Sequence, residues 1–353
     1  MSPVSTLTAI LRKHLFLAVV LFLTLIAIGG VFVQEIRAET QSILLFGKED
    51  ATVLYSTESP SSVRSVASLN FGFFTTSKFL QEHKNVRDQK IFLSPDRKYL
   101  AVTIQEGDGL TVSTYIANLN GDIVVSKRPG SFSSWSPDSK EVLLYLAIEA
   151  TGTERQIYSL GLNGEYRNLG LPPGVIGADI SPTDGSVVYA LTDSRTDNAD
   201  LYIRKDGKDQ RILSGQGHIL AWPRWSPNGT SIAFLKSDSA GHPDNQTLWL
   251  INPSEEGSAS EISHVQWNYP PIWSPDGVGV VFANNGNIWE LDTQQDELTN
   301  LTSGQTTDAK QPSYSSDGNT ILFSDGEQIW SIRGGDVLKI TNDSNVKGYP
   351  ILP

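Results

Sequence analysis

The chain of 353 residues has no cysteine and only five histidines, at positions 14, 83, 218, 242 and 264. The absence of cysteine excludes disulfide bonds, thiol nucleophiles and cysteine-ligated metal sites. None of the histidines has the spacing of a zinc-protease pair. Neither a Gly-x-Ser-x-Gly nucleophile motif nor a phosphate-binding loop occurs. We therefore predict no catalytic residue, no metal site and no cofactor.

Positive charge is also scarce. The chain has 27 basic and 39 acidic residues, which gives a formal net charge of −12. An acidic surface repels the phosphate backbone of nucleic acid, and no basic stripe offsets this repulsion. The composition therefore excludes nucleic acid as a partner.

The first 34 residues contain no acidic residue at all, and Leu15 to Val33 carry no charge of either sign. As a helix these 19 residues span roughly 28 Å, close to the thickness of a bilayer core. Arg12 and Lys13 precede the segment, so the positive-inside rule places residues 1–14 in the cytoplasm. We predict a single-pass protein of the plasma (inner) membrane.

A cleaved signal peptide is the alternative to a signal anchor, but the apolar segment is longer than usual for one. Either reading places the rest of the chain on the extracytoplasmic side. In the anchor reading, residues 15–33 form the transmembrane helix, 34–41 are a linker and 42–353 form the exported domain.

One short phrase recurs along the exported part at a nearly constant interval. Its lead residues are serines at positions 94, 136, 181, 226, 274 and 315, so the steps are 42, 45, 45, 48 and 41 residues. The fullest copy is Trp273-Ser274-Pro275-Asp276-Gly277. A self-similar period in this range is typical of repeat architectures.

Each copy of the phrase predicts a turn between two strands. Proline suits the first corner of the turn, Asp or Asn accepts a local hydrogen bond, and glycine supplies a positive φ. We assign these residues a structural role. They are Pro95, Asp96, Pro137, Asp138, Pro182, Gly185, Pro227, Gly229, Pro275, Asp276, Gly277, Asp317 and Gly318.

Short β-branched and aromatic runs follow each phrase, and tight turns such as Asn120-Gly121 separate later runs. Four antiparallel strands in a period of this length are the signature of a β-propeller blade. We predict an all-β propeller of seven four-stranded blades, with six as the alternative. Strands at the N- and C-terminal ends of the domain would close the ring, and residues near 70–88 would form an insertion.

The repeated phrase and the third strand with Ile-Tyr or Ile-Trp resemble the repeat of TolB-type β-propellers. The resemblance covers about residues 90–345. Similar repeats occur in propeller domains of prolyl-oligopeptidase-like peptidases. The resemblance implies the propeller fold and carries no catalytic residue with it, because the shared phrase is a structural turn.

Two segments outside the repeat pattern suggest a binding face. His218 and Trp222 lie in one of them, and His264, Trp267 and Tyr269 lie in the other. Both precede an innermost strand, on the side of the ring opposite the repeated turns. Aromatic side chains at a rim are common interface anchors, although these could instead plug the central channel as core.

These observations predict a membrane-anchored, extracytoplasmic propeller that binds or scaffolds a protein or glycan of the cell envelope. The alternative is a propeller-type hydrolase or lyase that acts on envelope glycans. A third hypothesis is a sensor, which would need a membrane partner because only 14 residues precede the apolar segment.

Overall fold

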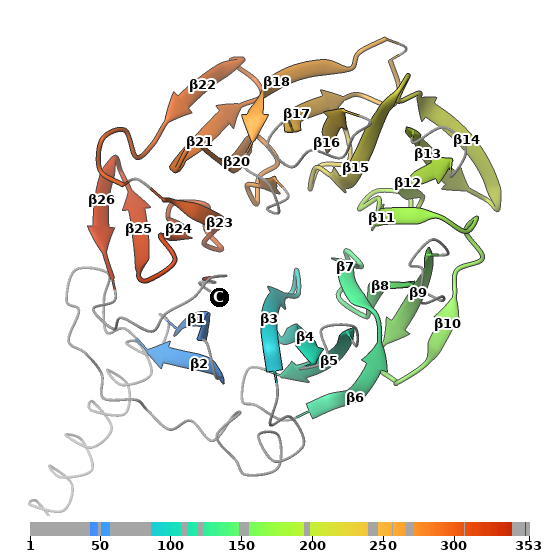
Figure 1. Cartoon of the computed structure of the whole chain (residues 1–353), viewed down its shortest axis with the longest axis horizontal. Helices are drawn as coiled ribbons and strands as arrows, with labels where there is room; N and C mark the ends of the chain where they lie inside the picture. The colour runs from blue at the N-terminus through green and yellow to red at the C-terminus, as the bar shows by residue number, and fades with distance from the viewer. Residues whose placement is uncertain are drawn as a thin grey trace, which may run out of the picture.

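The computed structural model describes residues 43–48, 51–56, 86–106, 112–118, 123–147, 155–193, 198–238, 246–255, 257–265, 271–306, 308–340 and 350. Every regular element among these residues is a β-strand. The sheets stand side by side in a ring, with the first strand of each group facing the centre (Figure 1). The predicted all-β propeller is confirmed.

The first two strands form an antiparallel pair of their own. They are β1 (Ile43–Lys48) and β2 (Ala51–Ser56). In Figure 1 this pair lies beside β3, at the side of the ring where the first and last strands meet.

The later strands come in antiparallel groups of four, innermost strand first. The first three groups are β3 (Val86–Leu93), β4 (Tyr99–Glu106), β5 (Val112–Asn118) and β6 (Ile123–Pro129); β7 (Ser131–Trp135), β8 (Glu141–Ala147), β9 (Arg155–Gly161) and β10 (Tyr166–Asn168); and β11 (Val175–Ile180), β12 (Val187–Asp193), β13 (Asn198–Lys205) and β14 (Lys208–Leu213). The remaining groups are β15 (His218–Trp225), β16 (Ile232–Asp238), β17 (Gln246–Ile251) and β18 (Ser260–Val265); β19 (Ile272–Trp273), β20 (Gly279–Asn284), β21 (Asn287–Asp292) and β22 (Glu297–Asn300); and β23 (Lys310–Tyr314), β24 (Ile321–Ser324), β25 (Ile329–Arg333) and β26 (Asp336–Lys339).

The predicted number of separate blades is wrong. The described strands form four separate four-stranded sheets, one eight-stranded sheet and the two-stranded pair β1–β2. The eight-stranded sheet arises because a parallel bridge between Ala199 and Ile219 connects β13 to β15. Neither seven nor six separate four-stranded blades is therefore present, although the repeat spacing places each group of strands correctly along the chain.

Within the groups, burial is highest in the second strand and lowest in the outermost strand. The second strands are almost wholly buried, as in β24, whereas the outermost strands β14, β22 and β26 are mostly exposed. This gradient explains the sequence pattern, because a strand covered on both faces is a continuous apolar run. An outer strand can be polar because water solvates its free edge.

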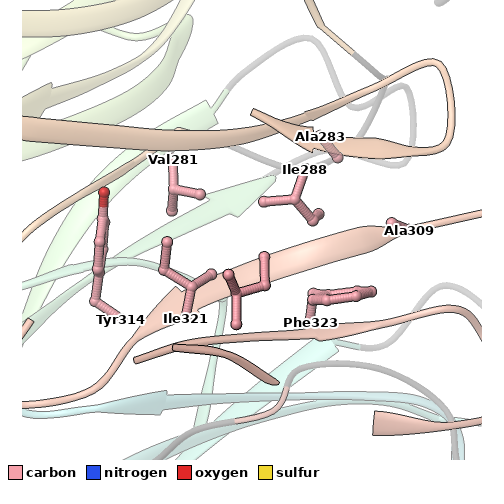
Figure 2. Close-up of a cluster of buried hydrophobic side chains, with 8 residues drawn as sticks. Val281, Ala283, Ile288, Ala309, Tyr314, Ile321 and Phe323 are labelled. Atoms are coloured by element: carbon pink, nitrogen blue, oxygen red, sulfur yellow. The ribbon is translucent and has the colours of Figure 1, made fainter. Parts of the chain in front are cut away.

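The core lies between neighbouring sheets. Figure 2 shows Val281 and Ile288 from one sheet facing Ile321 and Phe323 from the next. Tyr314 of β23 completes the same cluster. Each sheet thus buries its faces against its neighbours, so the ring has several small cores in place of a single large one.

Some predictions concern residues outside the described ones. The predicted transmembrane helix of residues 15–33 is among them, as are residues 70–85 of the predicted insertion. The last three residues of the predicted range, 86–88, belong to β3. In the part of the chain that the structure describes, no helix has the length and apolarity that crossing a bilayer needs.

Candidate binding site at the turn side of the ring

A pocket of about 580 Å³ opens at the ring axis, on the side of the repeated turns. Its lining residues come from the innermost strands and turns of groups that are far apart in the sequence. Because these groups meet only around the axis of the ring, we place the pocket there. The described lining residues are Phe92, Leu93, Ser94, Pro95, Arg97, Phe132, Pro227, Ile272, Trp273, Pro275, Gln311, Pro312, Ser313, Tyr314, Ser316 and Pro350. We call this cavity the axial pocket.

Neighbouring groups hold the aromatic walls of the axial pocket in place. The rings of Phe92 and Phe132 stack with centroids 3.9 Å apart. Trp273 Nε1 donates a hydrogen bond to the carbonyl oxygen of Arg224 at 3.2 Å. Tyr314 donates its hydroxyl hydrogen to Glu290 Oε1 at 2.6 Å. These fixed contacts across group boundaries make the pocket preformed, as is usual for ligand sites.

Five of the six repeated turns share one hydrogen-bond pattern, whereas in the third turn the backbone N–H of Ser186 donates to Asp184 and not to the lead serine. In the fifth group, Ser274 Oγ donates to Asp276 Oδ1 at 2.5 Å and accepts the backbone N–H of Gly279 at 2.7 Å. The backbone N–H of Gly277 donates to the carbonyl oxygen of Ser274 at 2.9 Å. The serine and the carboxylate thus satisfy the turn internally, and the proline is left to face the mouth.

Arg97 departs from the glycine pattern of these turns. It has φ +62° at the position where Gly229, Gly277 and Gly318 have φ between +70° and +74°. A side chain in this left-handed region is strained by about 1 kcal/mol or more, whereas glycine adopts it freely. The first turn therefore carries a long cationic side chain where the fold favours none.

The side chain of Arg97 lines the axial pocket with an unpaired nitrogen. Its Nη1 atom is buried and has no hydrogen-bond partner among the described residues. Burial lowers the pKa of the guanidinium, and the negative charge of Asp317 partly opposes this shift. A buried donor without a partner is costly, which sets this nitrogen apart from the other polar groups that line the axial pocket.

A buried charge pair lies on the innermost strands β11 and β15. Asp179 Oδ2 accepts the backbone N–H of Trp225 at 2.8 Å, and Arg224 Nη2 donates to the carbonyl oxygen of Ser133 at 2.5 Å. Burial raises the pKa of Asp179, and the charge of Arg224 opposes this shift. Because these bonds connect β7, β11 and β15, the pair joins three neighbouring groups and has a structural role.

The structure places two predicted binding residues within or beside the core. Trp222 is half-buried on β15 and meets the ring of Tyr145 edge to face, with centroids 5.8 Å apart. It also packs against the apolar cluster of β16, β17 and β20. His218 is half-buried, and its Nδ1 lies 3.1 Å from the carbonyl oxygen of Gly215.

The other predicted binding residues are His264, Trp267 and Tyr269. His264 is exposed on the outer strand β18, opposite Thr247 of β17. Trp267 and Tyr269 lie outside the described residues. Among the described residues no hydrogen bond, ion pair or ring contact joins His218, Trp222 and His264, so their grouping into one binding face stays a prediction.

A second cavity of about 630 Å³ lies between Gly304 and Trp330, away from the axis. Two of its three carboxylates, those of Asp308 and Asp325, already have partners. Asp308 pairs with Lys310 at 2.8 Å, and Asp325 accepts the backbone N–H groups of Glu327 and Gln328. In the described part of the chain no cluster of side chains could hold a metal ion. The axial pocket is therefore the better candidate.

The sequence analysis missed the axial pocket because it assigned the repeated turns a structural role only. One signal was present in the sequence: the fourth residue of the first turn is Arg97, where the last three turns have Gly229, Gly277 and Gly318. A bulky residue at a position that favours glycine is strained, and such strain can indicate a functional side chain.

Comparisons with known proteins agree with the fold. A family model described as TolB beta propeller domain matches residues 110–345. Among curated proteins, dipeptidyl-peptidase 5 of Porphyromonas gingivalis is 24% identical over 160 residues, which are 41% of this chain and 23% of that protein. The chain thus spans about a quarter of the length of this relative.

Two solved structures share the architecture. A protein of unknown function from Desulfotomaculum acetoxidans superposes with a TM-score of 0.53 at 12% identity, covering 88% of this chain and 98% of that one. Oligogalacturonate lyase from Vibrio parahaemolyticus gives a TM-score of 0.50 at 14% identity, covering 70% and 78%. At these identities the likeness concerns the fold alone.

Proposed function

Because this chain belongs to the TolB β-propeller domain family, we propose that it is a binding and scaffolding module that holds its partner at the axial pocket. The observation that supports the proposal is the preformed cavity of about 580 Å³ with aromatic and proline walls. Ligand sites are typically concave, mostly apolar and provided with a few polar groups. A peptide segment of a partner protein fits such walls better than a glycan, which presents more hydroxyl groups.

The proposal includes a place in the cell. An uncharged stretch from Leu15 to Val33, preceded by Arg12 and Lys13, supports a membrane anchor with an extracytoplasmic ring. A propeller held there could present its axial pocket to partners in the envelope.

The alternative of a hydrolase or lyase has less support. A glycan-cleaving site of the usual kind needs a pair of carboxylates beside the bond that breaks. None of the described residues that line the axial pocket is Asp or Glu. The lyase is similar to this chain in fold alone at 14% identity, and this chain covers only 23% of the peptidase, so neither activity carries over.

A peptide library panned against the full chain tests this function. The variant Ser316→Trp would fill the axial pocket, because Ser316 is exposed and belongs to the lining. The matched control is Gln295→Trp, which adds the same side chain at an exposed hairpin outside the lining. We expect peptides that bind the wild type and Gln295→Trp but not Ser316→Trp. Peptides or glycans that bind all three proteins equally would contradict a site in the axial pocket.

A further inference from the structure

We propose that the ligand of the axial pocket carries one carboxylate beside an apolar or aromatic group, and that Arg97 receives the carboxylate. This inference rests on the proposed function, because it names the chemistry that the same pocket would bind. It depends on three properties of the described residues: the backbone of Arg97, its unpaired nitrogen and the apolar walls around it.

The backbone of Arg97 indicates a role for its side chain. Arg97 and Gly277 occupy equivalent positions in the first and fifth turns. In each turn the backbone N–H of this residue donates to the carbonyl oxygen of the lead serine at 2.9 Å. Glycine meets the positive φ of this position without strain, as Gly277 does at +74°. An arginine therefore does not stabilise the turn, and we infer that its side chain has a role outside the turn.

The unpaired nitrogen indicates what the side chain binds. Nη1 of Arg97 is buried at the pocket without a hydrogen-bond partner among the described residues. A guanidinium donates two parallel hydrogen bonds to a carboxylate, and such charge-assisted bonds are stronger than neutral ones. An incoming carboxylate would satisfy the orphan donor and balance the desolvated charge together.

The surroundings limit the charge of the ligand. Arg97 is the one charged residue among the described residues of the lining, and the chain as a whole has a net charge of −12. A phosphate or a polyanion would meet too few donors and a repulsive field. A single carboxylate matches a single guanidinium.

The walls specify the rest of the ligand. The stacked rings of Phe92 and Phe132, the indole of Trp273 and the repeat prolines present apolar surface at the mouth. An aromatic or aliphatic group next to the carboxylate would bury against them and gain the hydrophobic term. Both a free aromatic acid and the C-terminal residue of a peptide have this chemistry.

The test titrates the full chain with three probes by isothermal calorimetry and ligand-observed NMR. The probes are 3-phenylpropionate, N-acetyl-phenylalanine and N-acetyl-phenylalaninamide, which lacks the carboxylate. The variant is Arg97→Gly, which restores the residue that other turns use, so it should fold. The control is Asn285→Gly, the same kind of replacement at an exposed turn residue with φ +48° that is not part of the pocket lining.

We expect at least one acid to bind the wild type and Asn285→Gly about 10- to 100-fold more tightly than the amide does. Arg97→Gly should reduce acid binding to the level of the amide and leave the melting temperature unchanged or higher. Preference for N-acetyl-phenylalanine would identify a peptide C-terminus as the source, and preference for 3-phenylpropionate a free acid.

Equal binding of acid and amide, or unchanged acid binding by Arg97→Gly, would overturn the carboxylate inference. If Ser316→Trp still abolished that binding, the proposed function would stand, because the pocket would remain the site. Failure of every probe to bind the wild type would also overturn the inference, and the panning experiment would then decide the proposed function separately.

Discussion

The hydroxyl oxygen of Ser139 accepts a hydrogen bond from the backbone N–H of Asp96 at 2.9 Å. The two residues are 43 positions apart and belong to the first and second repeat turns. Ser139 is buried and has φ +61°, in the same left-handed region as Arg97. The bond therefore connects consecutive turns at the mouth of the ring, through a residue that replaces the usual glycine.

The first prediction separates the hydrogen bond of Ser139 from its backbone strain. Ser139→Ala removes the acceptor and keeps a strained side chain, so it should lower the free energy of unfolding by about 1–2 kcal/mol. Ser139→Gly removes the same bond but relieves the strain, and should be about 1 kcal/mol more stable than Ser139→Ala. Urea denaturation of both variants measures the difference, and equal stabilities would contradict the account of this turn.

The second prediction concerns the buried charge of Asp179. Asp179→Ala would leave the backbone N–H of Trp225 without its acceptor and Arg224 without a nearby opposite charge. We expect a loss of about 2–4 kcal/mol in the free energy of unfolding. Asp179→Asn keeps one acceptor and should lose less. Thermal melting of the two variants tests this order, and a more stable alanine variant would refute it.

The third prediction is a dependence of stability on pH. Hydrogen bonds from Ser315 and Asn319 lower the pKa of Asp317 to about 2, from an ordinary 3.8. A carboxylate with a depressed pKa stabilises the folded chain above its unfolded pKa, and this contribution is lost as the pH falls through the folded value. The wild type should therefore lose stability between about pH 4 and pH 2.

Asp317→Asn checks the assignment of that pH effect. The variant should be less stable than the wild type at pH 6, and the difference should shrink as the pH falls toward 2. Asp317 is largely exposed, so solvent screening keeps the contribution of its carboxylate to the free energy of unfolding small. A difference that stayed constant over this range would contradict the role of the carboxylate.

The fourth prediction uses the close approach of Gly279 to Tyr314. A Cβ atom on Gly279 would lie 2.7 Å from the hydroxyl oxygen of Tyr314 and 3.1 Å from Glu290 Oε1. Gly279→Ala should therefore displace the Tyr314–Glu290 bond and lower the free energy of unfolding by about 1–3 kcal/mol. Combining it with Tyr314→Phe should be less than additive, because both changes remove the same bond. Additive losses in urea denaturation would contradict the shared bond.

The sequence predicted the propeller because its turns are local. Ser274, Asp276 and Gly277 satisfy one another within a few residues, so spacing alone located each group of strands. The division into sheets could not be predicted in this way. The bridge from Ala199 to Ile219 depends on how two neighbouring groups meet, and no pattern in the sequence reports that contact.

The axial pocket also depends on contacts between distant residues. Phe92 and Phe132 stack across two groups, and Trp273 bonds to the backbone of Arg224 from another. The aromatic residue that the sequence singled out, Trp222, is instead half-buried against Tyr145 and the core. Arg97, in contrast, lies within the repeat pattern and lines the axial pocket.

Hydrogen–deuterium exchange of the full chain, with and without a peptide selected by panning, tests the central claim most directly. If the partner binds in the axial pocket, exchange should slow in peptides that contain residues 92–97 and 311–316, on the turn side of the ring. Protection confined to the segments around His218, Trp222 and His264, with none at the turns, would contradict the axial pocket and favour the opposite face.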